Sequence, residues 1–323
     1  MKFILIGDCH STPSSKDEIE KLLIWAYNYA KEYSTDGIIL LGDLFDTHQH
    51  VNLDVTYSYL KIFRQCNDIE WILIPGNHDH SVHGSRLEHA LLPFNGLNNV
   101  KIFDAPDNKV QSYKGIDFAP FTRTEEEFLQ LCEAKQNELL ICHQEFKGAE
   151  YESGFYAPHG TDLNKVPYKQ IISGHIHKIQ QIGPCFYLGS PRWLKTSDAN
   201  QPKMIYLLDN NRITKQFDTR VVCKPIYKFE ITENSKWPET NDDARYIIEA
   251  TGTATFLDRM NVRYAGTAEV RGILSYKNDI VVKESTGIDM ALQNFVLNEY
   301  EMQYLSDKEE FWSRLKEELR NEH

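Results

Sequence analysis

Three short apolar runs, each followed by a glycine and a group of polar side chains, constrain the fold of this chain more than any other feature. The runs are residues 2–7 (KFILIG), 37–41 (GIILL) and 70–74 (EWILI), and they are typical of buried strands. Helical patterns separate them at residues 15–33 and at about 53–66. Strands alternating with helices over short connections predict an α/β fold with a parallel sheet covered by helices.

The pattern changes after residue 100, where the chain is richer in strands and is expected to be more antiparallel. One helix is predicted around 124–135. Together the two halves predict a two-sheet sandwich flanked by helices. The short strand-like runs of this half lie near 108–113, 115–119, 138–142, 169–173, 185–189, 203–209 and 212–218.

A polar segment containing proline, ITENSKWPETNDD, indicates a boundary near 220–235. It separates a first domain, predicted at residues 1–222, from a small α/β capping domain at 223–285 with strands at 244–251 and 267–275.

Spacing of capping-box type predicts two helix starts, at Ser15 with Glu18 and at Thr286 with Asp289. Residues 286–323 are expected to form a helical tail, whose last helix covers about 306–320. That helix carries an apolar stripe that either packs on its own domain or docks a partner. The stripe consists of Trp312, Leu315 and Leu319.

Composition narrows the class of protein. The 323 residues carry 35 Lys and Arg against 47 Asp and Glu, a net charge of −12, which excludes a uniformly basic coat protein but not an enzyme with a local basic surface. No signal-peptide pattern or apolar run of about 20 residues is present in the sequence, so no membrane association and a cytoplasmic location are expected. Six scattered cysteines without a CxxC pair predict free thiols.

Polar clusters follow the first three predicted strands: GDCH at 7–10, GDLFD at 42–46 and GNHD at 76–79. Asp43 follows Asp8 by 35 residues (43−8) and Asn77 follows Asp43 by 34 (77−43), about one strand–helix repeat each. The carboxyl ends of parallel strands share one edge of a sheet, so the clusters are expected to meet there. Two later strands end in further histidines, His143 and the pair His175 and His177.

This set of oxygen and imidazole ligands, without a thiolate, suits Mn, Fe, Zn, Ni or Co. It is too large for one tetrahedral ion and fits two ions that share a carboxylate. Taken singly, each motif is also compatible with an ordinary turn or helix cap. The candidate metal ligands are Asp8, His10, Asp43, Asn77, His143, His175 and His177.

The series GDCH, GDLFD, GNHD, a solitary histidine and GHIH, over residues 3–190, resembles the calcineurin-like metallophosphoesterases. The later FYLGSPRW and KMIYLLD are similar to the nuclease subunit of SbcCD-type double-strand-break repair complexes, and most similar to its phage recombination endonuclease type. The resemblance implies two divalent cations, Mn²⁺ first among them. One would bind Asp8, His10 and His177, the other Asn77, His143 and His175, and Asp43 would bridge both.

The resemblance also implies catalytic roles. His78 would lie over the scissile phosphate and assist the leaving oxygen, and Asp79 would orient His78 by hydrogen bonding. Asp46 stands where many relatives carry a histidine.

The implied activity is that of a DNA exonuclease or endonuclease subunit in recombination and double-strand-break repair, acting by two-metal in-line attack of a bridging hydroxide. Its implied partners are DNA, an ABC-type coiled-coil ATPase (the SbcC type) and a second copy in a homodimer, in the host cytoplasm if the chain is phage-encoded. The alternatives are a phosphodiesterase or phosphatase acting on a small nucleotide or a phosphoprotein, and a non-catalytic scaffold. The intact ligands and His78 argue against a scaffold.

Residues 192–228, here called the basic segment, carry eight Lys and Arg against three Asp (8−3=+5). They are either a DNA footprint or a solvated face. The candidate DNA contacts are Arg192, Lys195, Lys203, Arg212 and Lys215.

Two further groups of side chains are expected to lie outside the chemistry. Cys9 and Cys142 are expected in the core. Most of the histidines near the site loops are expected at the surface or in loops, with His48 or His80 able to touch substrate. These histidines are His48, His50, His80, His83 and His89.

Overall fold

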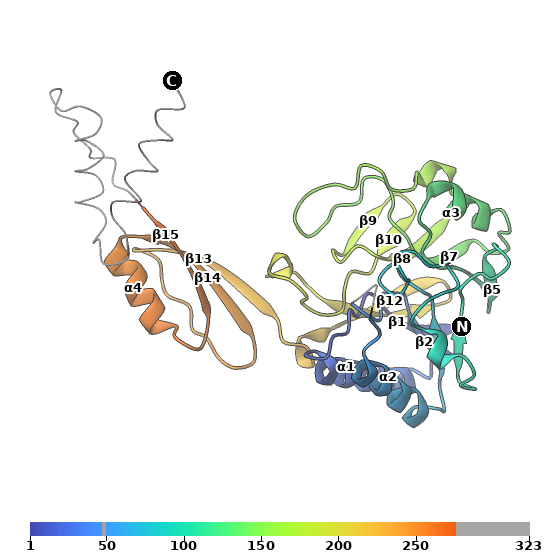
Figure 1. The fold of residues 1–323 in the computed structure, drawn as a ribbon, viewed down its shortest axis with the longest axis horizontal. Coiled ribbons are helices and arrows are strands. Elements are labelled where there is room, and N and C mark those ends of the chain that lie inside the picture. The colour runs from blue at the N-terminus through green and yellow to red at the C-terminus, as the bar shows by residue number, and fades with distance from the viewer. Residues whose placement is uncertain (47–49, 276–323) are drawn as a thin grey trace, which may run out of the picture.

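The computed structural model describes residues 1–46 and 50–275. They form a large part with two six-stranded sheets and a smaller part with a three-stranded sheet (Figure 1). Among these residues, no helix combines the length and apolar character that crossing a bilayer requires. The predicted helical tail at 286–323, with its capping box and apolar stripe, lies outside the described residues.

The first sheet has the order β12-β11-β1-β2-β3-β4. Strands β1 to β4 run parallel, as predicted for the first three, whereas β11 is antiparallel to β1 and β12 to β11. The N-terminal half alone therefore does not make this sheet. The strands are β1 (Lys2–Ile6), β2 (Gly37–Leu40), β3 (Glu70–Leu73), β4 (Val100–Ile102), β11 (Met204–Asp209) and β12 (Arg212–Asp218).

Both faces of the first sheet are buried at β1, β2 and β3, which explains the apolar runs of these strands. Ile4 and Ile6 pack in the cluster formed with helices α1 (Lys16–Glu32) and α2 (Leu53–Gln65). Phe3 and Leu5 point the other way, into the core between the two sheets, because side chains alternate along a strand.

Helix α1 starts after Ser15, as predicted, but the expected capping box does not form. Ser15 Oγ accepts from the backbone N–H of Thr12, and the Glu18 carboxylate accepts from Arg192 and from the backbone of Lys224. The spacing therefore predicted the end of the helix but not the role of Glu18.

The second sheet has the order β5-β6-β7-β8-β10-β9. The expectation of a more antiparallel second half is wrong for its centre, because β6, β7, β8 and β10 are parallel neighbours. Helix α3 (Glu125–Cys132) and a long loop after β7 supply the crossover connections that parallel pairing needs. The strands are β5 (Gln111–Tyr113), β6 (Ile116–Ala119), β7 (Leu139–His143), β8 (Gln170–Gly174), β9 (Gln180–Ile182) and β10 (Cys185–Tyr187).

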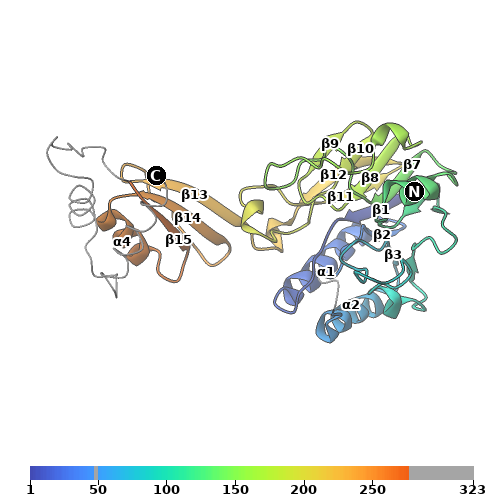
Figure 2. The same ribbon diagram turned by 45° about the horizontal axis from the view of Figure 1, so that its top comes forward.

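The smaller part projects from the sandwich beyond β12 (Figure 2). It consists of three parallel strands, β13 (Ile226–Thr232), β14 (Arg245–Gly252) and β15 (Glu269–Leu274), with helix α4 (Ala254–Arg263). It has an apolar cluster of its own around Ile248 and Met260. Part of the segment interpreted as a polar boundary is thus strand β13.

Candidate metal centre

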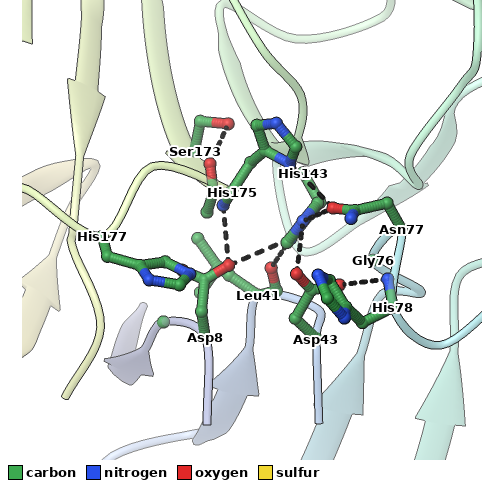
Figure 3. A network of polar contacts seen from close by, with 12 residues as sticks. Asp8, Leu41, Asp43, Gly76, Asn77, His78, His143, Ser173, His175 and His177 are labelled. Carbon is green, nitrogen blue, oxygen red and sulfur yellow. Dashed lines mark hydrogen bonds and ion pairs between the residues drawn. The ribbon is translucent and has the colours of Figure 1, made fainter. Parts of the chain in front are cut away.

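All seven candidate ligands converge at the carboxyl ends of strands from both sheets, and Figure 3 labels each of them except His10. The loops after β1, β2 and β3 of the first sheet contribute, together with the end of β7 and the loop after β8 of the second sheet. The ends of β7 and β8 lie against the loops that follow β2 and β1. The backbone N–H of His175 donates to Asp8 Oδ1 at 2.7 Å, and His143 Nδ1 lies 2.6 Å from the carbonyl oxygen of Leu41. The seven side chains therefore form one cluster.

One side of the cluster groups Asp8, His10 and His177, whose donor atoms lie within 4.8 Å of one another. The Nε2 atoms of His10 and His177 are 2.9 Å apart. Two imidazole nitrogens can share one proton at this distance, or can both direct lone pairs at one cation.

The other side centres on Asn77, whose Oδ1 lies 2.7 Å from His175 Nδ1 and 3.0 Å from His143 Nε2. Between the two groups stands Asp43. Its Oδ2 is 3.4 Å from His10 Nε2 and 3.4 Å from His143 Nε2, one ring of each group. This central position is the one that a bridging carboxylate requires.

The backbone at the site is closely packed at two glycines and adopts positive φ angles at three other residues. A Cβ atom at Gly76 would lie 2.2 Å from Asp43 Oδ1, and one at Gly42 would lie 2.4 Å from His143 Nδ1, so neither position accepts a side chain. His10, Asp43 and His175 have φ angles of 43°, 49° and 83°. Such left-handed backbone is costly for residues other than glycine and concentrates at functional sites.

The donor set fits divalent cations. Asp8 Oδ2 is buried and has no hydrogen-bond partner among the described residues, which is costly for a carboxylate unless a cation satisfies it. Burial raises the pKa of the Cys9 thiol to about 12, and Cys9 and Cys142 are fully buried, so both belong to the core as expected. The ligands are therefore nitrogen and oxygen atoms, which suit borderline divalent ions.

Charge complementarity couples the buried groups. Burial lowers the pKa of His143, but the Asp43 carboxylate outweighs it and raises that pKa to about 9. Burial would raise the pKa of Asp43, yet the neighbouring His143 and His10 hold it below its usual value. The Asp43 carboxylate is thus compensated by the neighbouring imidazoles, whereas burial raises the pKa of Asp8 above its usual value. A cation could replace the protons held by this group of side chains.

His78 lies at the edge of the cluster, with its ring centroid 4.6 Å from that of His10. Its backbone N–H donates to Asp43 Oδ1 at 2.8 Å. The oxygens of Asp79 accept from the backbone of Gly76 at 2.9 Å and of Phe45 at 3.1 Å, so this carboxylate fastens two site loops together.

The carboxylate that faces His78 and His10 is Asp46, a residue to which sequence reasoning gave no role. Its Oδ1 lies 2.9 Å from His10 Nδ1.

Two acidic side chains outside the predicted set contact the two histidines of GHIH, each at the ring nitrogen that faces away from the other candidate ligands. Glu145 Oε2 is 3.6 Å from His175 Nε2, and Glu152 Oε1 is 3.5 Å from His177 Nδ1. Such carboxylates fix the orientation of ligand imidazoles. Both lie on the loop between β7 and β8, where no periodic signal marks them.

The basic segment does not act as one surface, and two of its candidate DNA contacts need correction. Lys203 is fully buried, and its Nζ donates to Asp198 at 2.5 Å and to Ser190 Oγ at 2.8 Å. Arg192 is buried as well and donates to the backbone carbonyls of Cys9 and His10, both at 3.0 Å. These two cations hold the fold together, because buried charges need partners.

Two other candidates lie away from the metal centre. Arg212 pairs with Asp209, which pairs with Lys2 at the amino end of β1, whereas the metal centre is at the carboxyl end. Lys215 Nζ contacts the hydroxyl of Tyr33, just beyond the last residue of α1. Of the three candidates that are not buried, only Lys195 lies beside the metal centre.

Lys195 lines a cavity of about 630 Å³ that opens on the metal centre. His10, His78 and His177 form part of its wall. Its basic lining adds residues that sequence reasoning did not single out, among them Arg245 of β14, whose Nη2 donates to the carbonyl of Trp193 at 2.6 Å. The basic residues of the lining are Lys21, Arg192, Lys195, Lys224 and Arg245.

Two of the histidines expected at the surface or in loops are loop residues that are buried. His80 lies between the carbonyl oxygens of Gly76, at 2.7 Å, and Arg86, at 2.8 Å. His89 is buried next to it, with ring centroids 5.8 Å apart. Both stabilise the loop after β3 rather than face solvent.

Comparisons with protein families, with curated proteins and with solved structures each find similar proteins. The model of the calcineurin-like phosphoesterase family matches residues 1–179. Exonuclease subunit 1 of Enterobacteria phage T4 is 28% identical over 230 residues, which span 67% of this chain and 67% of that protein. Among solved structures, TT1561 of Thermus thermophilus covers 68% of this chain and 98% of its own at 12% identity and a TM-score of 0.41.

Proposed function

Because this chain belongs to the calcineurin-like phosphoesterase family, whose members bind divalent metals, we propose that it is a metal-dependent DNA nuclease. The similarity to a phage exonuclease subunit supports a phosphodiester substrate in nucleic acid. The match to the family model, over residues 1–179, includes all seven candidate ligands, so the proposal rests on the same residues as the metal centre.

One observation carries the choice of substrate. The cavity that opens on His10, His78 and His177 continues to exposed cations from both parts of the molecule, Lys195 and Lys224 before β13 and Arg245 on β14. A small phosphoester needs only the metal centre, whereas a polynucleotide presents further phosphates along its backbone. Cations beside the centre therefore favour a polyanionic strand.

We propose two cations, Mn²⁺ first among them, with Asp43 between them. Bound cations supply activation of the attacking water and neutralise charge on the phosphoryl oxygens. The chain contributes the rest: Asp8, His10 and His177 hold one position, and Asn77, His143 and His175 the other. His78 lines the cavity and is placed to stabilise charge on the phosphoryl group and to assist the leaving oxygen.

We also propose that the chain works with a partner subunit, an ABC-type coiled-coil ATPase, and as a homodimer, in DNA recombination and repair. The name of the phage relative, a numbered exonuclease subunit, supports a multi-subunit enzyme.

The test is a panel of substrates incubated with Mn²⁺: end-labelled single-stranded, blunt duplex and hairpin DNA, and a small aryl phosphodiester. We expect DNA cleavage that chelation by EDTA abolishes and that a His78→Ala preparation lacks, which excludes a contaminating nuclease. Hydrolysis of the small ester alone would contradict the DNA assignment. Mn²⁺ binding without hydrolysis of any substrate would contradict the enzyme itself.

A further inference from the structure

The loop between β7 and β8 (residues 144–169) carries two neighbouring exposed aromatic side chains at its tip. Phe155 is 75% exposed and Tyr156 is 66% exposed. Single exposed apolar residues are common on protein surfaces. Phe155 and Tyr156, however, are the only sequence neighbours among the exposed large apolar side chains of residues 1–46 and 50–275. The metal centre as described uses neither of them.

Two carboxylates of this loop contact histidines of the metal centre. Glu145 lies 3.6 Å from His175, and Glu152 lies 3.5 Å from His177. Phe155 follows Glu152 by three positions, so their Cα atoms are at most about 11 Å apart, at up to 3.6 Å per residue. The two aromatic rings therefore lie within a few nucleotides of a phosphate at His177, given about 3.4 Å per nucleotide in a stacked strand.

Backbone hydrogen bonds order the tip. Ala157 N–H donates to Ala149 O at 2.7 Å, and Tyr151 N–H donates to Phe155 O at 2.8 Å. Ala149 and Ala157 are buried in the core of the second sheet, and the Tyr151 hydroxyl donates to Glu145. The loop projects on the side of the sandwich that carries the smaller part (Figure 1). A tip ordered in advance loses little conformational freedom when its rings bind a flat ligand.

The charge of the tip indicates which part of a strand it binds. Residues 150–156 (EYESGFY) contain no Lys or Arg. Their two carboxylates are paired, Glu150 with Lys178 at 2.5 Å and Glu152 with His177 at 3.5 Å, so the tip itself offers no cation to a phosphate. Lysine and arginine instead line the cavity that His177 also lines, and none of residues 150–156 belongs to that lining. The backbone of a strand is thus attracted to the cavity, and the aromatic tip is left to contact bases.

We propose that Phe155 and Tyr156 form a stacking site for an unpaired nucleobase of the strand whose phosphate reaches the metal centre. This proposal rests on the proposed function and adds a preference within it. Bases in an intact duplex are already stacked on their neighbours, so only a single-stranded end, a loop or a frayed terminus can offer one. Stacking on aromatic side chains tolerates any base, which suits a nuclease that must cut any sequence.

The test compares a normal single strand with an abasic strand of the same length. Binding is measured by fluorescence anisotropy in a His78→Ala background, so that the probe is not cut. Stacking contributes about 1–3 kcal/mol per base, and 1.4 kcal/mol is tenfold in affinity. The double variant Phe155→Ala/Tyr156→Ala is therefore expected to bind the normal strand at least about fivefold more weakly, and the abasic strand as the parent does.

Two controls accompany the double variant. Tyr57→Ala removes an aromatic side chain of the same exposure, 66%, from α2, and is expected to leave both affinities unchanged. Phe155→Tyr/Tyr156→Phe keeps two rings and is expected to retain the affinity for the normal strand. A loss that only the ring-deleting variant shows, and only with bases present, is not a general effect on folding.

Each outcome decides one proposal. Equal weakening for normal and abasic strands, or none, overturns the stacking site while the nuclease assignment stands. A double variant that binds DNA normally but changes the oligomeric state in light scattering assigns the tip to protein contacts and also overturns it. If the wild-type chain hydrolyses the small aryl ester and cuts no DNA, the proposed function fails, and the stacking site fails with it.

Discussion

The metal centre and the basic segment (residues 192–228) differ in what determines the position of their charged side chains. In the metal centre, each side chain follows a strand of a buried sheet, and strand pairing brings the strand ends together. In the basic segment, each cation has different surroundings: Lys203 pairs with buried Asp198, Lys215 contacts Tyr33, and Lys195 lines a cavity. Backbone topology therefore gathers the first group and disperses the second.

The two regions also differ in whether their buried charges are satisfied without a ligand. The candidate ligands include buried acceptors such as Asp8 Oδ2, which lacks a hydrogen-bond partner among the described residues and which a cation could satisfy. Lys203 and Asp198 satisfy each other without any ligand. Removal of a side chain from the metal centre should therefore cost function, and removal of Lys203 should cost stability.

The largest expected effect comes from Asp43→Asn, which removes the charge between the two groups of ligands. Cation catalysis contributes several kcal/mol, and each 1.36 kcal/mol is tenfold in rate, so kcat/KM for an aryl phosphodiester should fall about a thousandfold or more. Bound Mn²⁺, measured by elemental analysis after gel filtration, should fall as well. Unchanged metal content with full activity would remove Asp43 from the centre.

The second test separates a ligand from a catalytic side chain at the same site. His78→Ala should lower kcat by about 10²–10⁴-fold, the usual contribution of a positioned acid or base, while Mn²⁺ content stays at the wild-type level. The expected contrast with Asp43→Asn is thus in metal content rather than in rate. Loss of metal on His78→Ala would instead make His78 a ligand.

The third test concerns stability. Lys203→Ala leaves the Asp198 carboxylate buried without its cation, and breaking a buried pair in this way costs about 3–5 kcal/mol. Lys195→Ala changes an exposed side chain and should stay within about 0.5 kcal/mol of wild type. Urea unfolding followed by circular dichroism measures both variants. Similar midpoints for the two would mean that the buried pair has no structural role.

The difference between the two regions also explains which parts of the fold and of the site could be predicted from the sequence. The positions of Asp8, Asp43 and Asn77 were predictable, because three apolar runs of strand length fixed their register relative to one shared edge. Helix α1 and its start were predictable for the same reason, from apolar periodicity.

The remaining features depend on contacts that no local pattern records. The burial of Arg192 depends on its contacts with Cys9, His10 and Glu18, which lie more than 170 residues earlier. Arg245 reaches the cavity only because β14 packs beside Trp193. Strand β13 was missed because its exposed face is polar and resembles a linker, and β11 and β12 join the first sheet through long-range pairing.

The smallest expected effect tests the basic segment directly. If Lys195 contacts a phosphate, Lys195→Gln should reduce the slope of log K against log salt by about 0.7 for a single strand, because one counterion fewer is released. Lys215→Gln makes the same chemical change on β12, beside Tyr33 and away from the cavity, so its slope should equal that of wild type. Binding in the His78→Ala background across a salt series measures both. Equal slopes for the His78→Ala parent and both variants would mean that charge near the metal centre does not guide the strand. An equal reduction of the slope in both variants would mean that the strand also crosses β12. The separation between the two regions would then not extend to substrate binding.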